Sequence, residues 1–396
     1  MTDSHRDRNR HDRHRHVAET DVLGSLRELL EADRDAVVAT VVDVDGRAYR
    51  RPGAKMVVDA DGVNRGHITA GCLEDEVLAL ATDVLAADEP RLETYDLVAD
   101  DDVWGLGLGC DGIIDVLLEP LDASYGPLVD AVEAAAPIGC VTVLDGETAD
   151  GAAIPLGARA YYRDDGVTSV DDRIPDWLLE AVREPAAALV DGGDATTLTL
   201  DTPEGSVTVF VDGIRPPPRL VAFGSGHDVG PLVDLGTKNG FHVTVVGFRG
   251  AIDLEDRFPD AAEHISTTPA DIAETVPLGE NTYPVVMTHT VVDDRLTVDA
   301  LLDTKVPYIG LMGPRERFEE ILEELEAGRT IDADALETVY APVGLDLGSG
   351  SPYGIATSVI AEIVAVHNGR APRHLSERDG PIHDRIGDVC PGVDED

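Results

Sequence analysis

Three consecutive prolines, Pro216, Pro217 and Pro218, interrupt the middle of the chain. Proline fixes φ and has no backbone N–H, so such a run forms a stiff extended spacer and continues neither a helix nor a central strand. The chain has 396 residues, which is too long for one ordinary domain. The proline run therefore predicts two domains joined by a linker over residues 213–219.

Strand and turn signals dominate the chain before the proline run. Apolar and β-branched residues recur at strand or helix spacing and are separated by Asp-Gly and other glycine turns. The expected elements are, in chain order, a helix over residues 22–30, strands over 37–42 and 55–59, a helix over 73–84, and strands over 112–118, 140–144 and 207–211. We expect one α+β domain over residues 20–212, preceded by a disordered His/Arg-rich tail over residues 1–19.

Beyond the prolines the pattern becomes a repeated alternation of strand and helix. The expected strands lie over residues 220–223, 241–246, 285–288 and 308–311, and a last helix is expected to start at Ser351 and stop near Asn368. Alternation of this kind predicts a parallel sheet with helices on both faces. The expected fold class is therefore α/β, with a Rossmann-like, doubly wound domain over residues 220–370 and an acidic tail over residues 371–396.

Acidic residues greatly outnumber basic ones, with 77 Asp and Glu against 31 Lys and Arg and a net charge of −46. We expect no nucleic-acid partner, because phosphate backbones require a cationic surface. The carboxylates are scattered among periodic apolar residues, which favours a solvated acidic surface suited to a salt-rich, halophilic cytoplasm. The N-terminus lacks the apolar core of a signal peptide and no apolar run could span a bilayer, so we expect a cytoplasmic protein.

A glycine-rich turn follows the first strand of the second domain. The strand over residues 220–223 runs directly into Gly224-Ser225-Gly226-His227-Asp228, where glycines and a helix N-terminus can approach a phosphate. The acidic residue that usually binds a ribose at the end of the second strand is replaced by Gly247, while Arg249 leaves a phosphorylated nucleotide open. Two interpretations stand side by side, binding of NAD(P) and glycines needed only for packing of helix on sheet.

His289, Asp293 and Asp294 follow the third expected strand of the second domain. This is the carboxyl edge of a parallel sheet, where such folds bind ligands. The three residues, with Arg315, form a candidate polar site for proton transfer or metal binding. The alternative is that His289 is a hydrogen-bonded structural residue.

Three cations lie within six residues of the first domain, namely Arg50, Arg51 and Lys55, in a chain that otherwise contains only two lysines. The cluster either pairs with carboxylates of the protein or neutralises an anionic ligand. Charge alone slightly favours the ligand.

Four cysteines, Cys72, Cys110, Cys140 and Cys390, are too few and too widely spaced for a disulfide framework or a zinc ribbon. Cys72 stands at the start of an expected helix, where amides and the helix dipole stabilise a thiolate. Cys110 follows Gly109 in a glycine-rich loop. A single cysteine is commonly a small buried hydrophobic residue, but two in glycine-rich loops beside cations suit a transition metal or sulfur transfer.

Several of these motifs, in matching order, resemble the xanthine dehydrogenase accessory factor family, XdhC/CoxI. The first domain contributes Tyr49-Arg50-Arg51-Pro52-Gly53-Ala54-Lys55-Met56, Gly71-Cys72-Leu73-Glu74 and Gly107-Leu108-Gly109-Cys110. The second domain contributes Phe223-Gly224-Ser225-Gly226-His227-Asp228, Arg257-Phe258-Pro259, Met287-Thr288-His289, Tyr308-Ile309-Gly310-Leu311-Met312-Gly313 and Pro342-Val343-Gly344-Leu345-Asp346-Leu347-Gly348. The resemblance spans about residues 20–370.

The resemblance implies an accessory protein that binds molybdenum cofactor (molybdopterin). It would protect the cofactor while a cysteine desulfurase adds a terminal sulfur, and deliver it to an apo molybdenum hydroxylase of the xanthine or CO dehydrogenase type. Arg51 and Lys55 would hold the phosphate, and Cys72 and Cys110 would contact the metal or its sulfur. The residues assigned to cofactor binding are Arg50, Arg51, Lys55, Gly71, Cys72, Glu74, Gly109, Cys110, Gly224, Gly226, His227 and Asp228. We expect a homodimer.

The sequence departs from the family pattern at four positions, Gly247, Pro314, Gly354 and Asp111, and the first three bear on nucleotide binding by the second domain. The main alternative function is an NAD(P)-dependent oxidoreductase that uses the glycine turn and His289. A third alternative is a scaffold whose second domain only docks a partner.

Overall fold

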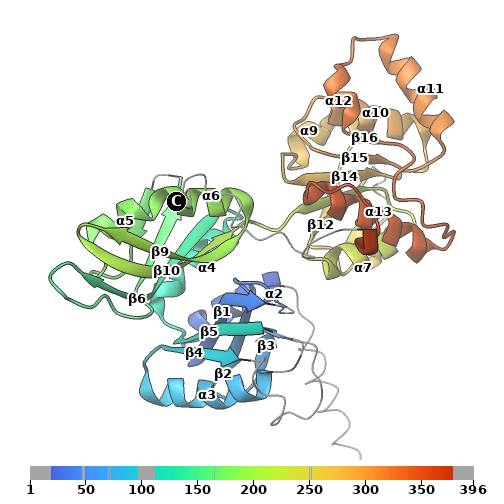
Figure 1. Cartoon of the computed structure of the whole chain (residues 1–396). Coiled ribbons are helices and arrows are strands. Elements are labelled where there is room, and N and C mark those ends of the chain that lie inside the picture. The colour runs from blue at the N-terminus through green and yellow to red at the C-terminus, as the bar shows by residue number, and fades with distance from the viewer. Residues whose placement is uncertain are drawn as a thin grey trace, which may run out of the picture. The chain divides into compact units, whose positions relative to one another are not determined.

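The chain forms two compact units that divide between Pro216 and Pro217 (Figure 1). The computed structural model describes residues 19–46, 50–69, 71, 73–96, 112–164, 166–248, 250 and 252–377. The dividing point lies within the expected proline spacer. The spacer is shorter than expected at both ends, because β10 continues to Ile214 and β11 already begins at Arg219.

The first unit begins with a five-stranded antiparallel sheet in the order β3-β2-β1-β5-β4. Val37, Ala39 and Val41 of the central strand pack against α3, whereas Ala36 and Val38 face α2 and α4. Burial on both faces explains the unbroken apolar run of this strand. The elements are α2 (Glu19–Glu31), β1 (Ala36–Gly46), β2 (Lys55–Asp59), β3 (Asn64–Gly66), α3 (Glu74–Ala87), β4 (Arg91–Asp96) and β5 (Gly112–Pro120).

A second five-stranded antiparallel sheet completes this unit, in the order β8-β7-β6-β10-β9. Helices α5 and α6 lie between β8 and β9 in the chain, as α3 lies between β3 and β4 in the first sheet. The elements are η1 (Ala123–Tyr125), α4 (Gly126–Glu133), β6 (Ile138–Thr148), β7 (Arg159–Arg163), β8 (Gly166–Ser169), α5 (Asp176–Ala181), α6 (Arg183–Gly192), β9 (Ala195–Thr202) and β10 (Gly205–Ile214). The first unit therefore consists of two repeats of one strand order, which the sequence analysis did not predict.

The repeats agree in local detail. Each first strand has eleven residues, and its pairing with the last strand is interrupted by a β-bulge, at Val42 in one repeat and at Leu144 in the other. These two residues share a small buried cluster with Leu117 and Phe210, which lie on the two last strands. Equivalent faces of the two sheets therefore pack against each other.

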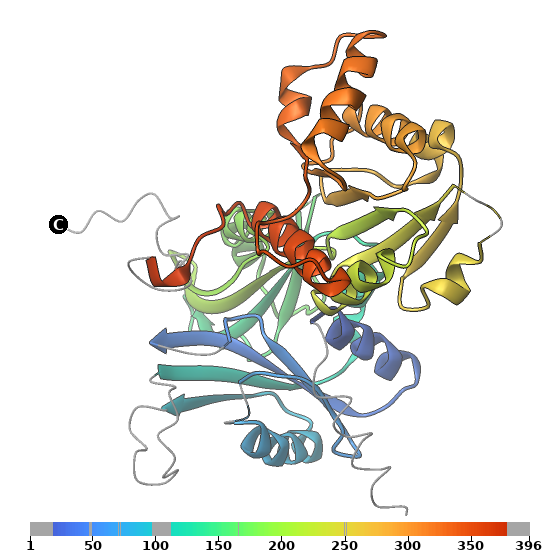
Figure 2. The same cartoon turned by 90° about the vertical axis from the view of Figure 1, so that its right-hand side faces the viewer.

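The second unit contains a six-stranded parallel sheet in the order β13-β12-β11-β14-β15-β16. Figure 2 shows α13, in red, beside α7 on one face of this sheet, and α10 and α11 pack on the opposite face. The elements are β11 (Arg219–Phe223), α7 (Val229–Lys238), β12 (His242–Gly247), α8 (Leu254–Arg257), β13 (Glu263–Ser266), η2 (Pro269–Asp271), α9 (Ile272–Thr275), β14 (Thr282–Val286), α10 (Val291–Leu302), β15 (Ile309–Leu311), α11 (Arg315–Glu326), α12 (Ala333–Glu337), β16 (Val339–Tyr340), α13 (Pro352–His367) and η3 (Leu375–Glu377).

The expected fold class is confirmed, with antiparallel sheets before the prolines and a doubly wound parallel sheet after them. One strand was misplaced. The strand predicted over residues 285–288 is β14, which begins and ends earlier, and β13 precedes it, so His289 follows the fourth strand of this unit and not the third. Within the described residues, no helix has both the length and the apolar run that crossing a membrane requires.

Candidate functional site

The strands that flank three motif-bearing segments of the first repeat begin or end at one edge of its sheet. Gly46, the last residue of β1, pairs with Gly112, the first residue of β5. Asp96, the last residue of β4, pairs with Ile113 beside them. The start of β2 and the end of β3 lie at the same edge, because both pairings there are antiparallel. The connections 47–54, 67–73 and 97–111 therefore all leave or enter the sheet at this edge, and the start of β2 lies opposite Thr40, six residues before Gly46.

The arginine turn consists of residues 50–54 and precedes β2. Arg50 is half-buried and Arg51 is exposed. Gly53 adopts a φ of 96°, which favours glycine, and its N–H donates to Val41 O at 2.8 Å. Lys55 lies behind the turn, only 9% exposed, and forms an ion pair with Asp212. Arg51 of the turn is thus exposed, while the ammonium of Lys55 is paired inside the protein.

Glu74 shapes the turn that leads into α3. Its buried carboxylate accepts hydrogen bonds from the N–H of Thr69 at 3.0 Å, the hydroxyl of Thr69 at 2.5 Å and the N–H of Leu73 at 3.2 Å. The hydroxyl of Thr69 in turn accepts from the N–H of Gly71 at 3.3 Å. Helix α3 begins two residues after Cys72, and Glu74 fixes the backbone on both sides of that cysteine. Cys72, Gly109, Cys110 and Asp111 themselves lie outside the described residues.

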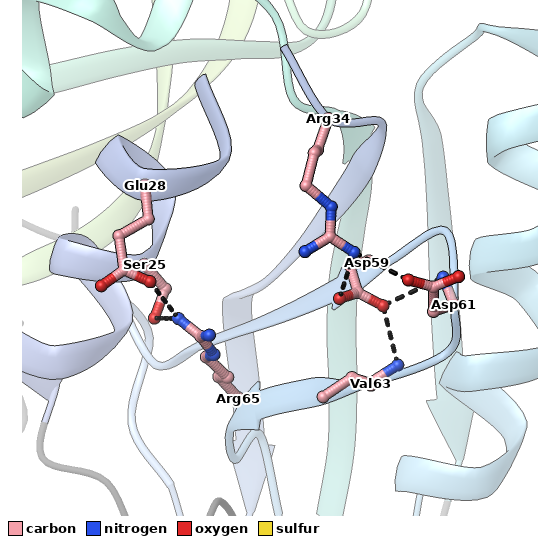
Figure 3. A network of polar contacts seen from close by, with 7 residues as sticks. All are labelled: Ser25, Glu28, Arg34, Asp59, Asp61, Val63 and Arg65. Carbon is pink, nitrogen blue, oxygen red and sulfur yellow. Dashed lines mark hydrogen bonds and ion pairs between the residues drawn. The ribbon is translucent and has the colours of Figure 1, made fainter. Parts of the chain in front are cut away.

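Other cations of the first repeat are paired away from this turn. Figure 3 shows Arg65 of β3, which donates to Ser25 Oγ at 3.0 Å and to Glu28 Oε2 at 2.8 Å on α2. Arg34 binds two aspartates of the β2–β3 hairpin in the same view. These contacts hold α2 and the hairpin together and stabilise the fold.

The second repeat lacks all three motif-bearing segments. Where the first repeat has the 15-residue connection 97–111, β9 and β10 are joined by Pro203 and Glu204 alone. The turn before β7 reads Pro155-Leu156-Gly157-Ala158 and contains no cation. Residues 170–175, which precede α5, contain no cysteine. The arginines and cysteines are therefore additions to the first repeat that the shared fold does not need.

Cys140 behaves as a structural thiol. It lies in β6, is 7% exposed, and its Sγ is 3.8 Å from Thr142 Oγ1. Burial raises the pKa of this thiol above its usual value of 9.0, and the nearby cation of Arg159 only partly opposes this shift. A buried neutral thiol is inert. Cys390 lies outside the described residues, as Cys72 and Cys110 do.

The two glycines of the strand-to-helix turn in the second unit have different neighbours. A Cβ on Gly224 would lie 2.6 Å from the backbone oxygen of Met287, so this position excludes any side chain. A Cβ on Gly226 would meet the side chains of Asp228 and His289, the latter at 2.6 Å. Gly224 thus lies close against the backbone that follows β14, and Gly226 leaves room for a polar pair. His227 is exposed.

His289 contacts Asp228, and not the aspartates that follow it in sequence. Its Nε2 lies 3.1 Å from Asp228 Oδ1, and its backbone has a φ of 62°, which is rare outside glycine. Asp294 is 1% exposed and accepts from the N–H of Thr288 at 3.2 Å and from Arg317. Asp294 therefore supports the loop that carries His289.

The remaining members of the predicted polar site do not join His289. Asp293 is half-buried at the start of α10, and Arg315 is exposed and pairs with Glu319 at 3.5 Å. Arg317, two residues further on, makes the buried contact to Asp294 that was not predicted. Among the described residues, no three His, Cys, Asp or Glu side chains gather closely enough to hold a metal ion.

The carboxyl edge of the parallel sheet contains a small cavity beside the glycine turn. Where a ribose-binding carboxylate would follow β12, a Cβ on Gly247 would meet the side chain of Leu254 at 3.2 Å. A cavity of about 100 Å³ between Asp228, Met287 and Ile355 is smaller than the roughly 300–1,000 Å³ of ordinary ligand pockets. A larger open pocket of about 500 Å³, near Lys305, contains none of the predicted site residues. Arg249 lies outside the described residues.

Fold and site together define a two-unit protein in which a duplicated antiparallel unit, with an arginine turn before its second strand, precedes a Rossmann-type sheet. The profile of the XdhC and CoxI family matches residues 29–96, and that of the XdhC Rossmann domain matches residues 220–363. The chain belongs to the XdhC/CoxI family.

Two relatives and one solved structure are similar over most of the chain. A probable xanthine dehydrogenase subunit of Bacillus subtilis (strain 168) is 30% identical, over 86% of this chain and 95% of the relative. The molybdenum cofactor insertion chaperone PaoD of Escherichia coli (strain K12) is 21% identical, over 87% of each chain. A crystal structure of a xanthine dehydrogenase from Bacillus halodurans is similar with a TM-score of 0.70 and 28% identity, covering 90% of this chain and 97% of that one.

Proposed function

We propose that this chain binds molybdenum cofactor as cargo at the motif-bearing edge of the first repeat and delivers it to an apo molybdenum hydroxylase. One observation carries the proposal: the strands that flank the arginine turn, the Cys72 turn and the 97–111 connection begin or end at one sheet edge, and the second repeat lacks all three segments. Membership of the XdhC/CoxI family supports it, as does the similarity to a relative named as a molybdenum cofactor insertion chaperone.

The donor groups at this edge fit the chemistry of the cargo, a phosphorylated pterin with a dithiolene-bound metal. Arg50 and Arg51 supply guanidinium groups, which bind phosphate through paired N–H donors. Cys72 and Cys110 supply soft sulfur ligands suited to a metal or to its terminal sulfur. Lys55 is assigned to the junction between the sheets and not to the phosphate, because Asp212 already neutralises it. Glu74 holds the Cys72 turn in shape.

The partners follow from the same role. A cysteine desulfurase would supply the terminal sulfur while the cofactor is bound, and the client would be a hydroxylase of the xanthine or CO dehydrogenase type. The role is that of a carrier, so no reaction is assigned to His289 or Asp228.

The test is the molybdenum and pterin content of protein purified anaerobically from a molybdate-grown host. Wild type should carry near-stoichiometric cofactor, and Cys72→Ala, Cys110→Ala and Arg51→Ala should lose most of it. Cys140→Ala is the matched control for a thiol, because Cys140 lies buried in the second repeat. A wild-type protein free of molybdenum and pterin, or equal loss in the Cys140 control, would overturn the proposal.

A further inference from the structure

A buried ion pair joins the two repeats directly behind the arginine turn. Lys55 is the first residue of β2 in the first repeat, Asp212 belongs to β10 of the second, and both side chains are 10% exposed. Lys55 Nζ also donates to the backbone oxygen of Gly53 at 3.1 Å. Asp212 therefore reaches the turn through Lys55. It also touches the turn itself, since Asp212 Oδ1 lies 3.3 Å from where a Cβ on Gly53 would stand.

A second, equivalent ion pair also joins the two repeats. Arg159 is the first residue of β7 and forms a 2.6 Å ion pair with Glu119 of β5, on the opposite repeat. The registers match, because Glu119 lies opposite Val38 of β1 just as Asp212 lies opposite Cys140 of β6.

The surroundings of this second pair match as well. Gly157, two residues before Arg159, has a φ of 80°, and a Cβ there would lie 2.9 Å from Glu119 Oε1. Both pairs thus bind a turn of one repeat to the last strand of the other. The two turns differ in their charge: the turn before Lys55 carries Arg50 and Arg51, and the turn before Arg159 carries no cation.

We propose that Asp212 is a positioning residue for the arginine turn. By holding Lys55, and through it the oxygen of Gly53, Asp212 fixes the backbone from which Arg50 and Arg51 extend. A fixed turn reduces the conformational entropy that is lost when two long side chains bind one phosphate. This reduction is the general basis of preorganised binding. This inference rests on the proposed function, in which these arginines bind the phosphate of the cofactor.

The experiment compares Asp212→Asn with Glu119→Gln, the equivalent change in the other pair. Both leave a buried cation uncompensated, so both destabilise the fold for the same reason. Only Asp212→Asn lies behind the arginine turn. A third variant, Lys55→Met combined with Asp212→Leu, removes both charges and is expected to fold well, because replacing a whole buried ion pair by apolar residues is tolerated.

The first readout is limited trypsin digestion, followed by mass spectrometry of the fragment that ends at Arg50. The next bond, Arg51–Pro52, resists trypsin because proline follows, so cleavage after Arg50 reports the order of the turn. We expect cleavage about tenfold faster in both variants that lack Asp212, and unchanged in Glu119→Gln. The second readout is titration with a phosphorylated pterin, followed by its fluorescence. Affinity should fall about tenfold in the same two variants only.

Equal acceleration of cleavage in Glu119→Gln and Asp212→Asn would overturn the inference, since both pairs would then act only on overall stability. Unchanged cleavage in the Lys55→Met, Asp212→Leu double variant would overturn it as well. A wild-type protein that binds no pterin would overturn the proposed function alone, because the digestion still decides whether Asp212 orders the turn.

Discussion

Arg159 and Glu119 form an ion pair 2.6 Å long between side chains that are 3% and 7% exposed. The hydroxyl of Tyr125 donates to the same Glu119 oxygen at 3.0 Å, and the guanidinium lies 3.8 Å from the centre of the Tyr125 ring. Burial raises the pKa of Tyr125 well above its usual value, so its hydroxyl remains a neutral donor. The interface between the two sheets thus contains a buried polar cluster inside an apolar core, in which Arg159 Nε has no hydrogen-bond partner.

Loss of this pair should strongly destabilise the first unit. Glu119→Gln leaves the guanidinium of Arg159 buried without a counter-charge, which typically costs about 3–5 kcal/mol. Urea unfolding monitored by circular dichroism measures the change in unfolding free energy. A loss below about 1 kcal/mol, the range of exposed ion pairs, would contradict the buried geometry.

Glu74 should contribute to both stability and cofactor content. Glu74→Ala removes the acceptor for the N–H and the hydroxyl of Thr69, while the N–H of Leu73 keeps Thr69 Oγ1 as an acceptor, and a buried donor left unsatisfied costs about 1–3 kcal/mol. We expect a lower midpoint of urea unfolding together with loss of molybdenum from the purified protein. Asp75→Asn, exposed in the same helical turn, is the control and should change neither quantity. Full cofactor content in Glu74→Ala would show that the shape of the turn does not matter.

The two glycines of the second unit should respond differently to alanine. Gly224→Ala places a methyl group against the rigid backbone of Met287, and overpacking of this kind costs about 1–3 kcal/mol. Gly226→Ala meets the side chains of Asp228 and His289, which can rotate away, so the loss should be smaller. Thermal unfolding of both variants tests this order. The opposite order would mean that Asp228 and His289 are held more firmly than the backbone.

Cys140 should resist alkylation in the native protein at alkaline pH. Burial raises the pKa of its thiol above 9.0, so at a given pH less thiolate is present than for an exposed cysteine, and only the thiolate reacts. In a variant that keeps Cys140 and replaces the other three cysteines by alanine, iodoacetamide labelling at pH 8–9 should become fast only after denaturation. Rapid labelling of the folded variant would refute this.

Nicotinamide dinucleotides should not stabilise the protein. Leu254 fills the space over Gly247 where a ribose-binding carboxylate would stand, and the cavity beside Asp228 is small. Addition of millimolar NAD⁺ or NADPH should therefore leave the melting temperature unchanged, since a ligand that binds only the native state must raise it. A clear rise with either nucleotide would restore the oxidoreductase alternative.

Strong local patterns made most of the central elements predictable. The β-branched run of β1, the short strand β2 and the capped helix α13 lie where the sequence placed them, within a few residues. The bounds of β14 were predicted wrongly. Pro284 lies inside this central strand, and only the residues after it show a strand pattern. The second repeat was not predicted as such, because only strands at β6 and β10 were expected, although β9 alternates half-buried Leu198 and Leu200 with exposed Thr199 and Asp201.

The candidate site was predictable in its residues and not in its contacts. Motifs predicted the arginine turn and the glycine turn. The contacts, however, join residues far apart in sequence: His289 and Asp228 are 61 residues apart, and Lys55 and Asp212 are 157 apart. No local spacing reveals such partners. The apparent grouping of His289 with Asp293 and Asp294 failed for this reason: proximity in sequence placed them together, whereas the carboxylate of Asp294 turns inward to Thr288 and Arg317.

The two-residue link between β9 and β10 has a consequence for folding. A strand order that closes with Pro203 and Glu204 alone demonstrates that the architecture folds without a long connection, an arginine turn or a cysteine turn. We therefore expect substitutions within residues 97–111 to change the folding stability of the paired sheets little.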